Sequence, residues 1–484
     1  MSTFLKKHKY KFTLYFLIGA YIIYFSYFTI LRYQTLYASY FDLGIMHQTV
    51  YNTYQSLLNL DFSRILELTD PFGPDQIKRM AIHNDILLAL LAPLYFIYSG
   101  PETLLIVQTV VIALGALAVY GIAQFVFNKN GFKNLVSLVF AAAYLLYPPL
   151  QRMNIYDFHA VALATTFLLF MFYFWLKKRY IPSFLFFLLS IISKEQVALT
   201  TLFFGLYALY TSRRNFLFSL AIISLSIIWF LASVLFVIPY FRGEAHFALE
   251  YYEGFNPANL MKNVFHIDTL RYFFFLFGPL GFLSFFSPLQ FLIALPEFAI
   301  NLLSNSWNMR NIIFHYTAVI QPFVFISAIY GTKKSIEMLE RSGKRRRIRL
   351  DKGAAIALFI LFFTLIFALS KGPLPFSREQ DIHPLQYPQV ERNEIVQWKQ
   401  LLQNDAIKVS TTGQLAPHFT SRRYFYTFSE YYYLADYIVL RLGEIYNYPE
   451  KDTLIPLYAQ LVFDPRFEKV YKKGDFEVYK KTRN

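Results

Sequence analysis

Long apolar runs alternate with short polar loops along most of the chain. A helix needs about 20 residues to cross roughly 30 Å of hydrocarbon, and the runs approach that length, although several are shorter. The predicted helices cover residues 11–31, 102–127, 133–149, 158–177, 180–193, 195–211, 215–239, 270–286, 289–304, 312–331 and 353–371. The pattern therefore predicts a mainly α fold, a polytopic bundle of transmembrane helices over residues 1–371.

The pattern changes in residues 372–484, where apolar stretches are short and polar residues are frequent. Helices are predicted at 394–402 and 454–462. Strands are predicted at 406–410, 423–428 and 435–440, with a closing hairpin at 467–479. Such alternation predicts a small α/β domain. It contains no Gly-rich phosphate loop, which argues against nucleotide binding.

Composition agrees with a membrane protein, since 56% of the residues are hydrophobic and only 16% are charged. The net charge of +15 comes largely from loops between apolar runs, as the positive-inside rule expects, so it does not indicate a nucleic-acid partner. The absence of cysteine excludes disulfides, thiolate catalysis and cysteine-ligated zinc. The apolar run at 11–31 lacks a small-residue cleavage site, which predicts a retained first helix.

Basic loops predict the orientation in the plasma membrane. Lysines at 6, 7, 9 and 11 place the N-terminus in the cytoplasm, and the most basic loop, 332–352, lies on the same side. Counting crossings between such loops leaves no room for 85–99 as a span. It is predicted to be half-inserted or surface-lying on the outer face, within a long first loop, 32–101. The count gives about eleven crossings, with the C-terminal domain extracytoplasmic.

Polar residues near the predicted helix ends fall almost entirely on the outer face. They are Asp42, His47, His83, Asn84, Asp85, Asp157, His159, Lys194, Glu195, Arg242, Glu244, His246, Glu297, Arg310 and His315. A charged group at membrane depth costs about 2.5–3.5 kcal/mol on insertion scales and indicates function by default. Their gathering on one face predicts a single cavity.

Several of these residues have simpler interpretations. Asp42 could cap a short interfacial helix, and His83 could be an interfacial histidine without a role. Lys194 and Glu195 could form a local ion pair in a tight helical hairpin, which the sequence favours over chemistry. A divalent metal held by carboxylates and histidines of different loops is an open alternative, because no metal-binding spacing occurs.

The chain resembles a family of membrane proteins catalogued as domain of unknown function 2079. The matching pieces are Phe-Asp-Leu-Gly at 41–44, His83 with Ala-Pro-Leu-Tyr at 92–95, Tyr-Asp-Phe-His at 156–159, Lys-Glu at 194–195, His-Tyr at 315–316 with Gln-Pro-Phe at 321–323, Thr-Gly-Gln-Leu-Ala-Pro-His at 412–418, and Ser-Arg-Arg at 421–423. They occur in order through almost the whole chain. Gln196 departs from the pattern, in which an acidic residue follows Lys-Glu.

That family is similar in layout to the C-type integral-membrane glycosyltransferases, which use polyprenyl- or dolichyl-phosphate sugars. The resemblance implies that Asp42 is the general base for an inverting transfer to a glycan, lipid or protein acceptor. Lys194, Arg242 or Arg310 would hold the lipid phosphate, and His83, His159 and His315 would hydrogen-bond phosphate or sugar. His47, Asp157 and Glu195 complete the candidate substrate-binding set.

Two other classes of function fit the same pattern. A transporter or lipid flippase would show inverted repeats and helices broken at the midplane, and no internal repeat is visible. A non-catalytic membrane scaffold would have no deep cavity beside Asp42. Convergence of Asp42, His83, Asp157 and His159 on one cavity would favour the glycosyltransferase.

Overall fold

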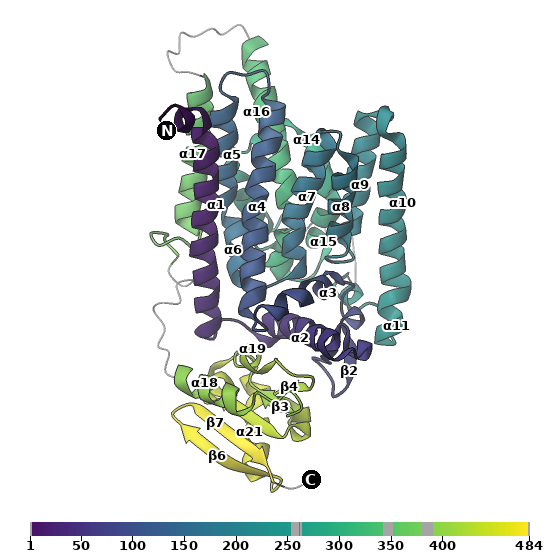
Figure 1. The fold of residues 1–484 in the computed structure, drawn as a ribbon, viewed down its shortest axis with the longest axis vertical. Coiled ribbons are helices and arrows are strands. Elements are labelled where there is room, and N and C mark those ends of the chain that lie inside the picture. The colour runs from purple at the N-terminus through teal and green to yellow at the C-terminus, as the bar shows by residue number, and fades with distance from the viewer. Residues whose placement is uncertain (1, 253–260, 262–263, 342–351, 380–390, 483–484) are drawn as a thin grey trace.

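The computed structural model describes residues 2–252, 261, 264–341, 352–379 and 391–482. A helical bundle is covered at one end by the first loop and the C-terminal sheet (Figure 1). Most of the arginines and lysines of the basic loop 332–352 fall at positions 342–351, outside the described residues.

Five described helices have the length and composition to cross a membrane. They are α1 (Ser2–Gln34), α4 (Glu102–Val126), α5 with α6 (Lys133–Leu145 and Pro148–Tyr156), α10 continued by α11 (Phe216–Ala232 and Ile238–Arg242), and α17 (Lys352–Lys371). Shorter helices fill the bundle between them. They are α7 (Ala160–Leu176), α8 (Tyr180–Ile191) and α9 (Val197–Thr211). The helix α16 (Gln321–Arg341) has 21 residues, but its final part is polar.

Several predicted spans are wrong as continuous helices. The run 312–331 becomes α-helical only at Gln321, where α16 begins, and the run 133–149 is divided between α5 and α6. The run 270–286 consists of α13 (Ile267–Phe277) and two 3₁₀ turns, separated by Gly281 at φ +59°. Here Pro279 cannot donate a helical hydrogen bond, and glycine adopts the left-handed turn without a steric cost. The run 289–304 is likewise broken, into α14 (Pro288–Phe291), a 3₁₀ turn and α15 (Leu295–Leu303).

The first loop forms a layer across the end of the bundle. It contains the π-helical turn η1 (Tyr40–Gly44), α2 (Ile45–Asn59), the hairpin β1–β2 (Glu67–Thr69 and Gln76–Lys78), α3 (Leu87–Leu91) and the 3₁₀ helix η4 (Ala92–Phe96). Together α3 and η4 are too short to span, and α2 and α3 lie crosswise under the bundle (Figure 1). Residues 45–53 of α2 are all buried, because this helix is covered on both sides.

The C-terminal part forms a mixed sheet of order β4-β3-β5-β7-β6. The strands are β3 (Val409–Thr411), β4 (Phe425–Thr427), β5 (Tyr437–Arg441), β6 (Phe467–Lys473) and β7 (Phe476–Lys481). β3 pairs in parallel with β4 and β5, whereas β7 pairs antiparallel with β5 and β6. The predicted helices are present as α18 (Arg392–Leu401) and α21 (Lys451–Phe463). The short α19 (Ala416–Phe419) and α20 (Leu442–Asn447) were not predicted.

One face of this sheet shares a hydrophobic core with the first loop. Leu36, Tyr40, Ile45 and Leu68 cluster with Val409, Leu415, Phe419, Phe425 and Val439, and all of these side chains are buried. The Tyr40 amide also donates to the carbonyl of Gly413 at 3.0 Å. The sheet therefore fixes the position of η1, the turn that carries Asp42. A domain boundary at 371/372 stays a prediction.

Candidate functional site

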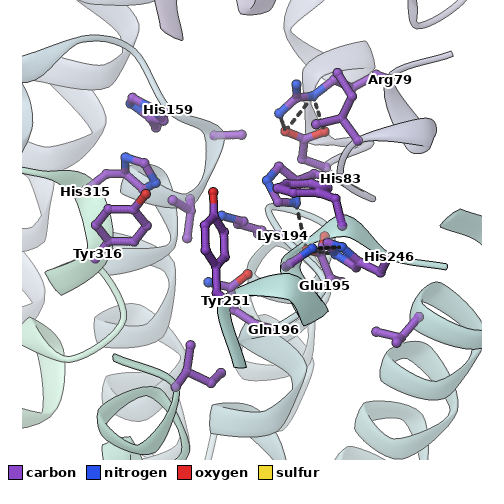
Figure 2. Close-up of a pocket in the computed structure, with 18 of the residues that line it drawn as sticks. Arg79, His83, His159, Lys194, Glu195, Gln196, His246, Tyr251, His315 and Tyr316 are labelled. Atoms are coloured by element: carbon purple, nitrogen blue, oxygen red, sulfur yellow. Dashed lines mark hydrogen bonds and ion pairs between the residues drawn. The ribbon is translucent and has the colours of Figure 1, made fainter. Parts of the chain in front are cut away.

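A cavity of about 730 Å³ lies between the first loop, the α8–α9 turn and the segment that follows α11. Figure 2 shows two polar groups facing each other, His159 with His315 and Tyr316 on one side, and His83 with Glu195 and His246 on the other. Lys194 and Tyr251 lie between them. Seven of the ten site residues predicted from the sequence line this cavity: Asp42, His83, His159, Lys194, Glu195, Arg242 and His315.

Asp42 is held by side chains at the turn between α6 and α7 and by Ser39 of its own loop. His159 Nε2 lies 3.0 Å from Oδ1, the Tyr156 hydroxyl donates to Oδ2 at 3.1 Å, and the Ser39 hydroxyl donates to the same oxygen at 3.3 Å. No described backbone N–H donates to this carboxylate, so it does not act as a helix cap. The side chain is 20% exposed, at the wall of the cavity.

The turn η1 brings Asp42 to that wall through close backbone packing. A Cβ atom at Gly44 would lie 2.9 Å from Cδ2 of Tyr40, so only glycine lets the turn close over this ring. π-helical turns often occur at functional sites, where they redirect a side chain.

Asp42 and its neighbour Asp157 differ in the direction in which their pKa values are shifted. Burial alone would raise the pKa of Asp42, but the contacts with His159, Tyr156 and Ser39 outweigh it and hold the pKa below its usual range. Burial and the Asp42 charge raise the pKa of Asp157 well above its usual range. Asp42 is therefore the carboxylate that stays ionised.

Gln108 on α4 fixes the turn that positions His159. Its side-chain amide donates to the carbonyls of Asn154 and Asp157, and its oxygen accepts the His159 N–H at 2.9 Å. The His159 ring stacks on His315, which begins the 3₁₀ turn η12 (His315–Thr317), with ring centroids 3.8 Å apart. Nδ1 of His315 is buried and has no hydrogen-bond partner among the described residues.

Glu195 joins three segments on the opposite side of the cavity. Its Oε1 lies 2.9 Å from Nδ1 of His83 and 3.2 Å from Nε2 of His246, and Oε2 accepts the Asn84 N–H at 3.0 Å. Burial opposes ionisation, but His83, His246 and the nearby Lys194 hold the pKa of Glu195 well below its usual range. Burial lowers the pKa of His83 to about 3. These three side chains could hold a metal.

Lys194 presents its ammonium to the cavity. The local ion pair with Glu195 that the sequence favoured is not formed, because Glu195 is engaged by the two histidines. No residue that the structure describes forms an ion pair with Lys194. A partly buried ammonium that no described carboxylate neutralises is a site for an anion. Burial lowers the pKa of Lys194, while neighbouring carboxylates oppose this change.

Three of the predicted site residues do not line the cavity. His47 is buried in α2, where its ring nitrogens contact the hydroxyls of Tyr95 and Ser421 at 2.7 and 2.8 Å. Asp157 accepts the N–H of Ser39, the residue before η1, at 3.2 Å. Arg310 donates to the Ser304 carbonyl at 2.7 Å, outside the cavity lining. Asp157 thus holds the backbone just before η1, whereas His47 joins α2 to η4 and to the C-terminal part.

Sequence reasoning missed other residues of the cavity. Arg79 forms a bidentate pair with Asp85, with distances of 2.8–3.1 Å, and Tyr251 and Tyr316 also line the cavity. His246 was noted only as an outer polar residue. Arg79 gave no signal because arginines are common in loops, whereas Tyr316 lies in a matched motif and could have been found.

These features define a multi-pass membrane protein with a polar cavity at one end of its bundle. The chain belongs to the family of predicted membrane proteins DUF2079, whose model matches residues 32–465. No curated protein matches it.

Solved structures with a similar arrangement share little sequence with the chain. ArnT from Cupriavidus metallidurans bound to undecaprenyl phosphate is 11% identical, over 95% of this chain and 98% of that chain, with a TM-score of 0.48. The apo oligosaccharyltransferase of Archaeoglobus fulgidus is 13% identical, over 92% of this chain and 72% of that chain, with a TM-score of 0.44. At these values the likeness gives no basis for assigning a function.

Proposed function

We propose that this protein is a membrane glycosyltransferase that moves a sugar from a polyprenyl- or dolichyl-phosphate donor to an acceptor on the outer face. The observation that carries the proposal is the presence of two chemically complementary groups in one cavity. The ionised carboxylate of Asp42 and the ammonium of Lys194, which forms an ion pair with no described residue, both line it. The first can accept a proton and the second can bind a phosphate, as such a transfer requires.

The rest of the lining suits a lipid-linked donor. Leu199 of α9 and Phe230 and Val234, on α10 and the π-helical turn that follows it, give the cavity an apolar side. Arg242 at the end of α11 adds a second cation, whose guanidinium lies 5.5 Å from the Phe247 ring centre. An isoprenoid tail would pack against the apolar side while the phosphate meets the cations.

In the proposed mechanism Asp42 takes the proton of an acceptor hydroxyl as that oxygen attacks the anomeric carbon. The bond between this carbon and the phosphate oxygen breaks, and Lys194 and Arg242 stabilise the leaving phosphate. A single displacement inverts the anomeric configuration. His159 and Tyr156 orient Asp42 by hydrogen bonds at 3.0 and 3.1 Å. A divalent metal is not required by these steps.

The alternatives receive less support from the site. A non-catalytic scaffold predicts no cavity beside Asp42, yet this side chain lines one of about 730 Å³. A transporter or flippase predicts inverted repeats with a polar site at the midplane. The polar lining found here instead combines the first loop with helix-connecting turns at one end of the bundle.

The test is sugar transfer by the purified full chain from a panel of polyprenyl-phosphate monosaccharides. Asp42→Asn should lower kcat about 10²- to 10⁴-fold, because it removes the proton acceptor and keeps the shape. The control is Asp61→Asn, a partly exposed residue of the same loop that does not line the cavity, and it should leave the rate near wild type. Equal rates for Asp42→Asn and wild type would refute the assigned base.

A further inference from the structure

In the cavity lining, two histidines from distant segments meet at one carboxylate oxygen of Glu195. His83 precedes α3, Glu195 lies in the α8–α9 turn and His246 follows α11. Their ligand atoms all lie within 4.8 Å of one another, and Figure 2 shows the three converging. We propose that His83, Glu195 and His246 bind a zinc ion, at a centre separate from Asp42.

The observed spacing is close to that of a zinc site. Bonds of about 2.0–2.2 Å in a tetrahedron place neighbouring ligand atoms about 3.3–3.6 Å apart. The two histidine nitrogens lie 2.9 and 3.2 Å from Glu195 Oε1, so small side-chain movements would admit the ion. Two imidazoles and one carboxylate form the type of zinc site that keeps one position open. The Asn84 N–H on Oε2 orients the carboxylate, as outer partners of metal ligands do.

Zinc would take the place of the two N–H protons through which the histidines contact Glu195. Without the metal, His83 and His246 each donate an N–H to Glu195. Coordination shifts the His83 proton to Nε2, which lies free of any partner that the structure describes. For His246 the proton shifts to Nδ1, which accepts the Ala248 N–H at 3.1 Å. That backbone bond must open, so zinc binding moves the turn η7 (Phe247–Tyr252), which carries Tyr251.

The charges around the cluster couple the metal to an anion. Arg79 is neutralised by Asp85 at 2.8 Å, whereas no described residue pairs with Lys194. Zinc and this ammonium repel each other until an anion lies near both. A phosphate in the cavity would therefore tighten zinc binding, and this step alone rests on the proposed function.

The test measures the metal content of the purified full chain after zinc loading and removal of unbound metal. Wild type should retain about one zinc per chain, and Glu195→Gln and the double variant His83→Ala with His246→Ala should retain less than about a tenth of that. The control is His266→Ala, whose side chain is 50% exposed, and it should retain the wild-type amount. Wild type without zinc, or variants that keep it, would overturn the proposal.

A second measurement avoids variants that fail to fold. Wild type loaded with cobalt(II) should show the visible absorption of a four- or five-coordinate centre, which added zinc should abolish and added inorganic phosphate should shift. A weak octahedral spectrum would overturn the site. Zinc and cobalt binding are measured without a sugar donor. The zinc site can therefore fail while the Asp42→Asn result supports the proposed transfer, and the transfer can fail while the zinc site is supported.

Discussion

Replacing His159 should change the pH at which the proposed enzyme loses activity. His159 Nε2 lies 3.0 Å from Oδ1 of Asp42, and both groups are largely shielded from water, with side-chain exposures of 6% and 20%. After burial, which acts in the opposite direction, this histidine is the largest influence on the Asp42 pKa, and it lowers it. The variant His159→Ala removes the contact and leaves the carboxylate in place.

The expected magnitude follows from the lost hydrogen bond. A bond to a charged group contributes about 1.5–3 kcal/mol, which corresponds to a roughly 10- to 100-fold change in proton affinity. The folded-state pKa of Asp42 lies below its usual range, so activity should persist to low pH in wild type and fall as the pH drops through that pKa. In His159→Ala the pKa rises, and the fall should begin at higher pH.

The assay is kcat/KM for sugar transfer measured across the acidic range. The matched control is His159→Gln, whose amide can still donate to Asp42 and should keep the acid limb near wild type. If the acid limb of His159→Ala coincides with wild type, or if both variants shift equally, His159 does not set the proton affinity of the base.

The remaining predictions concern orientation and the attachment of the sheet. Because the chain lacks cysteine, Glu468→Cys on β6 should react with an impermeant maleimide in intact cells, and Met338→Cys on α16 only after permeabilisation. The reverse pattern would refute the orientation. Arg423→Ala should lower the free energy of unfolding by about 1–3 kcal/mol, because it leaves Glu67, now 2.8 Å from Arg423 and 7% exposed, without this partner. The control is Arg271→Ala, an exposed residue, which should lower the free energy of unfolding by less than about 1 kcal/mol. Both variants are compared with wild type by thermal unfolding.

The helices were predictable where apolar runs are long and uninterrupted. α4 and α17 occupy almost the predicted ranges, because hydropathy alone determines such a helix. The prediction failed at Gly281, where a residue in the left-handed conformation interrupts the helix within an apolar run. Hydropathy does not register such a break, since the residues on both sides remain apolar.

The site was predictable in part, because polar residues at helix ends are unusual enough to be counted. Asp42, His159 and Lys194 were selected in this way and line the cavity. Their partners were harder to assign, since Glu195 was expected beside Lys194 and instead contacts His83 and His246. Contacts between residues more than 50 positions apart depend on packing that local patterns do not encode.

The shared core of the first loop and the C-terminal sheet has a consequence for synthesis. His47 and its partner Ser421 are 374 positions apart. At about 5–20 residues per second, the ribosome makes the second roughly 20–75 s after the first. Throughout that interval the layer around Asp42 lacks the surface that buries α2. Until the sheet has been made, a nascent chain therefore lacks the contacts that hold the turn carrying Asp42, and with them the complete proposed site.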